Sequence, residues 1–188
     1  MSLKLYKGIF INELPNRFLC NVIIYGKTEK CYLPFNTKLN KYFILNKNEV
    51  LLKNIKKKKS KTRYSIFAIK INNHYVLVNL SYANFLLYSN LMSKTFSFLG
   101  ERSIFKKEYY ILPNYKTDIF IPETKTIIEV KTVIGFTETV LFPIEYSERF
   151  YNQLQSIFSM LKRGYRACIF ICILTSVATL DFNTVASI

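Results

Sequence analysis

Charged side chains on two neighbouring apolar runs are the residues in this sequence best placed to carry out chemistry. The runs cover residues 116–121 and 126–131 and flank the turn Pro122–Lys125, a pattern typical of a β-hairpin. Side chains two residues apart on a strand point the same way, so the charged residues of both runs are expected on one face. Counting back from the turn places Asp118 directly opposite Glu129 and Lys116 directly opposite Lys131.

Two opposed carboxylates need a neutralising partner. Like charges directly across a sheet destabilise it by a few tenths of a kcal/mol to about 1 kcal/mol. A divalent cation between Asp118 and Glu129 would remove that repulsion, and one or two carboxylates with water are ligands that Mg²⁺ accepts. Lys131 would then lie beside the metal, where it could position a water or stabilise the charge of a phosphate. The alternative is an exposed hairpin face on which two acids and two lysines neutralise one another.

The hairpin is one of a series of short motifs that runs from about Phe10 to Leu174. In order, they are Asn16-Arg17-Phe18-Leu19, Pro34-Phe35-Asn36-Thr37-Lys38-Leu39, Lys61-Thr62-Arg63-Tyr64, Ala83-Asn84, Glu108, Lys116-Thr117-Asp118-Ile119, Glu129-Val130-Lys131-Thr132-Val133 and Phe142-Pro143. In content and order these motifs resemble the Asp…Glu-x-Lys nuclease superfamily and, within it, the sugar fermentation stimulation protein family. The resemblance implies an oligonucleotide-binding (OB) type barrel followed by a restriction-endonuclease-like α/β nuclease core.

The resemblance also implies roles for residues outside the hairpin. Glu108 stands at the place of a third acidic group, and the alternative is a surface glutamate. Gln153 occupies the usual place of a histidine, Lys116 stands where the family has arginine, and Ile144 stands where Phe-Pro is usually followed by aspartate. Arg149 lies one helical turn before Gln153, so both side chains could face the metal.

The chain is strongly basic. It has 27 Lys and Arg against 12 Asp and Glu among 188 residues, a formal net charge of +15. Such an excess indicates a polyanionic partner, DNA or RNA, whose binding would depend steeply on salt because neutralised phosphates release counterions. The alternative is compositional drift, since the excess is mostly Lys and accompanies abundant Asn, Ile, Tyr and Phe, as an AT-rich genome would produce.

Residues 1–80 predict a small β-barrel that binds nucleic acid. Short β-type runs alternate with turn signals, among them Asn72-Asn73, which is typical of a tight hairpin. The run Lys56–Lys61 could track phosphates, and a solvated loop is the alternative. The prediction that Arg17 and Lys38 also line the binding groove rests on the resemblance alone. The nucleic-acid-binding residues predicted in this domain are Arg17, Lys38, Lys57, Lys58, Lys61 and Arg63.

Residues 81–188 predict an α/β nuclease-like domain, so the fold class is α+β. Ser81 begins a helical pattern whose apolar positions are Phe85, Leu86, Tyr88 and Leu91. After the hairpin, residues 132–141 are expected to continue the sheet. A helix is predicted from the N-cap Ser147 to Arg163, with Gly164 as its stop, and residues 165–174 are expected to form a buried strand.

Four cysteines, Cys20, Cys31, Cys168 and Cys172, lie in apolar runs, and nothing resembles a signal peptide. Buried free thiols in a reducing cytoplasm are therefore expected, and a single histidine argues against zinc. The longest uncharged stretches are at or below the roughly 18 residues that a membrane span needs, so no span is expected. No protein partner is evident, and a homodimer is one arrangement that the sequence allows.

The hypothesis that the sequence favours is a metal-dependent nuclease acting on DNA or RNA. Asp118 and Glu129 would bind Mg²⁺, for which Mn²⁺ could substitute. Glu108 would assist directly or through water, Lys131 would orient the attacking water, and Lys116, Arg149 and Gln153 would help to hold the substrate. The alternative is a nucleic-acid-binding or regulatory protein whose nuclease core is silent, and the departures at Ile144 and Gln153 motivate it.

Overall fold

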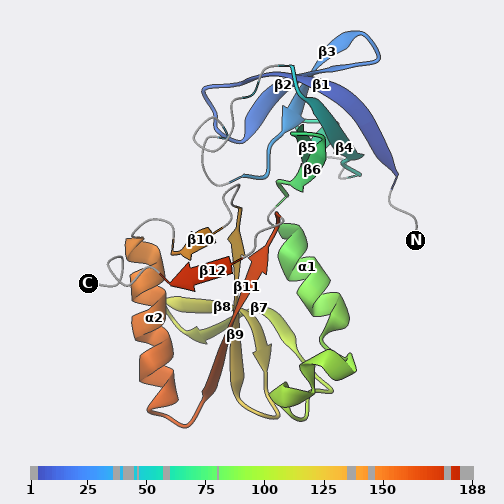
Figure 1. Cartoon of the computed structure of the whole chain (residues 1–188). Helices are drawn as coiled ribbons and strands as arrows, with labels where there is room; N and C mark the ends of the chain where they lie inside the picture. Colours follow the sequence, from blue (N-terminus) through green and yellow to red (C-terminus); the bar gives the residue numbers. More distant parts are fainter. Residues whose placement is uncertain are drawn as a thin grey trace. The chain divides into compact units, whose positions relative to one another are not determined.

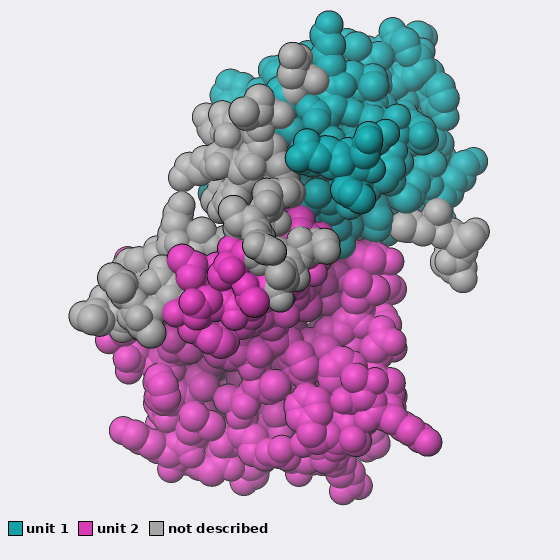
Figure 2. All heavy atoms as spheres, in the orientation of Figure 1, with its two compact units in different colours: residues 1–81 teal, residues 82–188 magenta. Residues whose placement is uncertain are grey.

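The computed structural model describes residues 4–35, 39, 45, 47–56, 60–79, 81–134, 139–143, 147–175 and 179–182. Its contacts divide the chain into two compact units, residues 1–81 and 82–188 (Figure 2). The predicted site residues Lys38, Lys57 and Lys58 lie outside the described residues, as does Ile144.

The first unit is a closed five-stranded barrel with one further strand (Figure 1). The strand order is β3-β2-β1-β4-β5-β6, and a parallel pairing of β3 with β5 closes the barrel. The expected OB-type barrel is therefore confirmed. Asn72 and Asn73 join β5 to β6 with φ values of 46° and 67°, the left-handed backbone that a tight hairpin turn requires. The strands are β1 (Leu5–Glu13), β2 (Leu19–Ile24), β3 (Lys27–Tyr32), β4 (Glu49–Asn54), β5 (Tyr64–Ile71) and β6 (His74–Leu77).

Alternating side chains fill the barrel interior. In β2 the side chains of Cys20, Val22 and Ile24 are buried, whereas Ile23 between them is exposed. Cys20 is a free thiol, as expected, and burial raises its pKa. Gly8 on β1 lets the strands pack closely, since a Cβ there would lie 2.6 Å from Val22 Cγ1.

The second unit is an α/β core built on a four-stranded sheet of order β11-β9-β8-β7 (Figure 1). β11 runs parallel to β9, and the other neighbours are antiparallel. Two short strands, β10 and β12, pair separately and in parallel. The elements are α1 (Ser81–Asn90), the 3₁₀ helix η2 (Lys94–Leu99), β7 (Lys106–Leu112), β8 (Tyr115–Ile121), β9 (Thr126–Val133), β10 (Thr139–Phe142), α2 (Glu148–Leu161), β11 (Arg166–Ile173) and β12 (Thr179–Phe182).

The two helices cover opposite faces of this sheet. Alternate residues of β8 separate the cores, because Ile119 and Ile121 pack on the α1 side and Phe120 packs on the α2 side. On the α1 side the buried partners are Leu87, Leu91, Leu99 and Ile128. On the α2 side they are Tyr115, Ile127, Ile157 and Met160.

The packed face of α1 and the strands around the hairpin differ from what the sequence pattern alone indicates. α1 buries Ala83 and Leu87, whereas Phe85 and Leu86 are 53% and 44% exposed. Apolar residues occur on several sides of this helix, so its periodicity does not identify the packed face. β9 ends at Val133, and the strand that follows pairs with β12 instead of extending the central sheet. β11 is mostly half-buried, not buried. Among the described residues, no helix is long and apolar enough to cross a membrane.

Candidate functional site

The predicted hairpin is present, but its two strands separate where the charged residues begin. The ladder between β8 and β9 consists of the pairs Ile119↔Ile128, Phe120↔Ile127 and Ile121↔Thr126. Beyond these pairs, β8 continues along β7 and β9 continues along β11. The prediction that the ladder also pairs Asp118 with Glu129 and Lys116 with Lys131 is therefore wrong.

Side chains replace the main-chain ladder at this point. Thr117 Oγ1 donates a hydrogen bond to the Ile128 carbonyl oxygen at 2.8 Å. Asp118 Oδ2 accepts one from the Val130 N–H at 2.8 Å. These bonds satisfy main-chain groups of β9 that an antiparallel partner would otherwise satisfy, so the strands can part without leaving buried polar groups unpaired.

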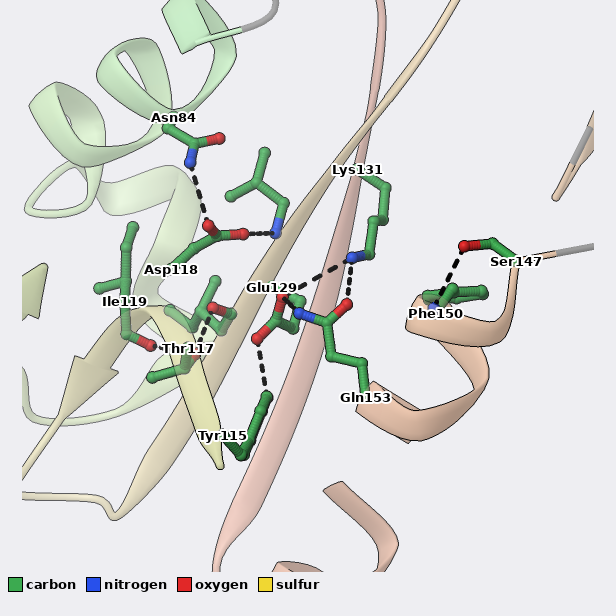
Figure 3. Close-up of polar contacts among 12 residues, drawn as sticks. Asn84, Tyr115, Thr117, Asp118, Ile119, Glu129, Lys131, Ser147, Phe150 and Gln153 are labelled. Carbon is green, nitrogen blue, oxygen red and sulfur yellow. Dashed lines mark hydrogen bonds and ion pairs between the residues drawn. The ribbon is translucent and has the colours of Figure 1, made fainter. Parts of the chain in front are cut away.

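Helix α1 fixes the other oxygen of Asp118. Asn84 Nδ2 donates to Asp118 Oδ1 at 3.2 Å, and Figure 3 shows the carboxylate between that amide and the β9 main chain. The carboxylate is half-buried and accepts two neutral donors.

Glu129 is buried, with 1% of its side chain exposed. Tyr115 donates its hydroxyl to Oε1 at 2.7 Å, and Gln153 on α2 donates to Oε2 (Figure 3). Burial raises the pKa of Glu129 and so does the charge of Asp118, whereas the hydrogen bond from Tyr115 and the charge of Lys131 lower it. The fold therefore holds a carboxylate where its charged form is poorly solvated and close to a second negative charge.

Lys131 lies on β9, the strand that also carries Glu129, and its side chain joins the two carboxylates at the site. Its Nζ lies 3.7 Å from Glu129 Oε2 and donates to Gln153 Oε1, so the Gln153 amide bridges the two side chains. Burial lowers the pKa of Lys131, the charges of Glu129 and Asp118 oppose this, and the charge of Arg149 lowers it further. Gln153, one of the two α2 residues that the sequence analysis places toward a metal, is hydrogen-bonded to Glu129 and Lys131.

A hollow of about 660 Å³ lies next to this group. Tyr115 and Gln153, the two residues bonded to Glu129, line it together with Arg149 and Lys116. The Arg149 side chain is exposed, and Lys116 is partly so. Two cations thus face a cavity whose wall is formed by the partners of the buried carboxylate.

Glu108 does not join the two acids. The neighbouring pairs Lys107↔Ile119 and Tyr109↔Thr117 place it opposite Asp118 in register, but its own backbone is left-handed, with φ of 46°. Its carboxylate is 71% exposed and forms an ion pair with Lys116 at 2.7 Å, and this hydrogen bond lowers the pKa of Glu108. In the described part of the chain, no cluster of three or more His, Cys, Asp or Glu residues could hold a metal ion.

The donor set nevertheless fits a hard divalent cation. Two carboxylates lie close enough for one to raise the pKa of the other, and an amide lies beside them. Mg²⁺ is commonly bound by one or two carboxylates while waters and substrate phosphates fill the remaining positions. Asp118 and Glu129 are the residues that would hold it.

Two residues of the site are not predicted by the chemistry of the sequence pattern. Tyr115 is 3% exposed and bonded to Glu129, yet strict alternation along β8 would place it on the face opposite Phe120. The alternation along β8 is interrupted before Phe120, since Asp118 bonds Asn84 of α1 although Phe120 packs on the α2 side. Asn84 is part of the Ala83-Asn84 motif that carries the resemblance, but no local signal connects it to Asp118.

Of the six cations predicted in the barrel, the structure describes Arg17, Lys61 and Arg63. Arg17 lies over the Phe18 ring at 4.7 Å and Arg63 over the Tyr64 ring at 5.3 Å. Lys61 lines a second hollow, which belongs to the barrel alone.

Fold and site together define a class of protein in which an OB-type barrel precedes an α/β core that carries an Asp…Glu-x-Lys pattern at a strand opening. Family models match both parts. The model "SfsA N-terminal OB domain" matches residues 13–78, and "Sugar fermentation stimulation protein RE domain" matches residues 81–184. The chain belongs to the sugar fermentation stimulation protein family.

Individual relatives agree with this assignment. The sugar fermentation stimulation protein homolog of Natranaerobius thermophilus is 25% identical over 171 residues, which cover 88% of this chain and 70% of the relative. The homolog of Methanobrevibacter smithii is 27% identical over 180 residues, 89% of this chain and 74% of the relative. The structure of Pyrococcus furiosus SfsA, solved in complex with Ca²⁺, covers 99% of this chain and 82% of its own, with a TM-score of 0.79 and 20% identity. At 20% identity, this structural similarity shows that the two proteins share a fold.

Proposed function

We propose that this protein is a divalent-metal-dependent nuclease that hydrolyses phosphodiester bonds of DNA or RNA. The observation that carries the proposal is the convergence of Asp118, Glu129 and Lys131 at the opening between β8 and β9, beside a cation-lined hollow. Family membership supports it, and so does the Ca²⁺ in the Pyrococcus furiosus relative, which suggests a cation site in this fold.

The site residues divide the work of hydrolysis. Bound by Asp118 and Glu129, Mg²⁺ or Mn²⁺ would polarise a phosphoryl oxygen and lower the pKa of water. A water oxygen bonds to phosphorus and gives up a proton, the ester P–O bond breaks, and the leaving oxygen takes up a proton. Lys131 stabilises the negative charge that develops on the phosphoryl oxygens and orients the water. Gln153 fixes Lys131 relative to Glu129 through both ends of its amide.

The hollow beside the site would hold the substrate backbone. Arg149 and Lys116 line it and can contact phosphates that flank the scissile bond. Lys116 would then exchange its surface ion pair with Glu108 for a phosphate. Such an exposed pair contributes little to stability, so the exchange costs little.

A second candidate is a nucleic-acid-binding or regulatory protein whose core does not cleave. The burial of Glu129 favours it, because hydrogen bonds from Tyr115 and Gln153 already occupy both carboxylate oxygens. With both oxygens already hydrogen-bonded, Glu129 offers a cation fewer free lone pairs than an exposed glutamate does.

A cleavage assay on the purified full chain separates the two. Single- and double-stranded DNA and RNA are incubated with Mg²⁺ or Mn²⁺, and Asp118→Asn is compared with Asp181→Asn, which makes the same change on the exposed strand β12. Asp118→Asn should lose about 100-fold or more of the activity. Asp181→Asn should stay within about twofold of the wild type. Equal activity of Asp118→Asn and wild type would remove this site, and binding without cleavage in any divalent ion would leave the second candidate.

A further inference from the structure

The positive charge of the chain is concentrated in its first unit. Residues 1–81 contain 16 Lys and Arg against three Glu, a formal net charge of +13, whereas residues 82–188 contain 11 Lys and Arg against nine acidic residues, a net charge of +2. Compositional drift acts on the whole chain and does not explain this division. The barrel therefore carries nearly all of the excess that could attract a polyanion.

A hollow of about 890 Å³ lies on the barrel. Among the described residues that line it, four are lysines and none is Asp or Glu. The lysines come from β3, from β4 and from the segment between β4 and β5, so they surround the hollow from several elements. They are Lys30, Lys53, Lys56 and Lys61.

The same hollow contains a stacked aromatic pair. Phe18 and Tyr32 have ring centroids 6.3 Å apart and an angle of 27° between their planes, and Tyr32 is 39% exposed. Arg17 lies over the Phe18 ring with its guanidinium carbon 4.7 Å from the centroid. Phe18, just before β2, and Tyr32, at the end of β3, thus hold flat apolar surfaces at the hollow among cations.

Aromatic surfaces among cations distinguish a single strand from a duplex. A duplex keeps its bases stacked inside and presents phosphates, so it can use the lysines but not the rings. A single strand offers unstacked bases together with phosphates and can use both. The size of the hollow suits inserted bases, since small-molecule sites span about 300–1,000 Å³.

We propose that this hollow is a single-strand-binding groove, in which a base stacks on Tyr32 and Phe18 while Lys53 and Lys61 contact the adjacent phosphates. The inference deepens the proposed function, on which it rests, by naming the type of nucleic-acid strand that the barrel binds. Stacking on an aromatic ring tolerates any base, so the groove selects single strands without reading sequence.

The test is the affinity of the full chain for a fluorescent thymidine oligonucleotide and for a blunt duplex of equal length, in EDTA so that no cleavage occurs. Tyr32→Leu keeps an apolar side chain and removes the ring, so single-strand affinity should fall about tenfold while duplex affinity changes by less than about twofold. Tyr25→Leu is the matched control, because Tyr25 is 82% exposed in the β2–β3 turn and does not line the hollow. It should leave both affinities unchanged.

Several outcomes would overturn the inference. These are an equal loss of single-strand and duplex affinity in Tyr32→Leu, no loss at all, or the same loss in Tyr25→Leu. A second measurement needs no variant: an oligonucleotide carrying 5-iodouridine is photocrosslinked to the wild-type chain, and crosslinks should map to Phe18 or Tyr32. Crosslinks only outside the groove would count against it. Failure of the nuclease proposal appears instead as absent cleavage with single-strand binding intact.

Discussion

Glu129 is the residue on which the chemistry of the site most depends. Burial and the charge of Asp118 raise its pKa above the ordinary 4.5, so folding disfavours the ionised form relative to the unfolded chain. The stability gained from that protonation is present at low pH and is lost as pH rises through the raised pKa. Cation binding has the opposite dependence, because only the ionised carboxylate binds a metal. Acid should therefore release a cation from this site at a higher pH than from an exposed glutamate.

Tyr115→Phe should shift this acid limit to a still higher pH. The Tyr115 hydroxyl lowers the pKa of Glu129, so its removal takes away one of the interactions that oppose the effect of burial. The measurement is the rise in melting temperature caused by Mg²⁺ or Ca²⁺ between about pH 5 and pH 8, since a ligand that binds only the folded state stabilises it. Tyr109→Phe, on a ring that stacks against Phe120, is the control. Identical pH profiles for the two variants would contradict the role given to Tyr115.

Asp118→Asn should stabilise the metal-free protein and abolish its response to cations. The amide keeps an acceptor for the Val130 N–H, and rotation of the Asn84 amide restores the second hydrogen bond. Without the negative charge of Asp118, the repulsion between the two carboxylates disappears. The free energy of unfolding should rise by about 0.2–1 kcal/mol. Thermal melts with and without Mg²⁺ measure both effects, with Asp181→Asn as control. A lower melting temperature without metal, or an undiminished response to Mg²⁺, would contradict this account of the pair.

At the scale of elements, each helix brings one amide to the site. α1 supplies Asn84 to Asp118, and α2 supplies Gln153 to Glu129 and Lys131. α2 begins at the N-cap Ser147, whose Oγ accepts from the Phe150 N–H, as the sequence predicts. After α1, the chain is held by Arg102, whose guanidinium donates to three main-chain carbonyls. The contacts after the end of α1 and at the start of α2 therefore help to place the two amides that bond the acidic pair.

Arg102→Ala should destabilise the second unit by about 2–3 kcal/mol, because it leaves carbonyls near the end of α1 without their charged donor. The three acceptors are the carbonyls of Leu91, Ser93 and Gly100, at 2.6, 2.9 and 2.7 Å. Arg102→Lys should be intermediate, because one ammonium cannot reproduce the planar fork. Urea unfolding followed by circular dichroism gives the free energies, with the exposed Arg163→Ala as control. Equal stability of Arg102→Ala and the control would contradict the role of this fork.

For the whole molecule, charge and chemistry are assigned to different units. The barrel carries +13 of the formal charge of +15, and the α/β core carries the carboxylates. Carboxylates at a cleavage site repel a polyanion, so a separate cationic barrel would provide affinity that the core lacks. This division suits a protein that binds a strand in one unit and acts on it in the other.

The salt dependence of binding should reveal which unit holds the strand. The double variant Lys53→Gln and Lys61→Gln should reduce the slope of log affinity against log salt by about 0.7 for each single-strand phosphate that the protein no longer neutralises. Lys162→Gln with Arg163→Gln makes the same change in net charge at the end of α2 and should leave the slope near that of the wild type. Equal slopes in the two double variants would mean that net charge alone, and not the groove, sets the affinity.

Features that depend on neighbouring residues could be predicted from the sequence. The Asn72-Asn73 turn, the Pro122–Lys125 turn, the Ser147 N-cap and Gly164 after α2 all appear where expected. Each is decided within a few residues by backbone strain or a local hydrogen bond, so its signal lies in the local sequence. The hairpin pattern located the acidic pair, and the resemblance added that the predicted barrel is of the OB type.

Tertiary structure decided how that pair is arranged. Counting along the hairpin assumed that the ladder continues, but Thr117 and Asp118 bond to the β9 main chain and let the strands part. Burial of Glu129 depends on Tyr115 and on Gln153 from α2, and the direction of Asp118 depends on Asn84 from α1. These contacts join residues distant in sequence, and their free energies depend on packing and desolvation that no local pattern contains.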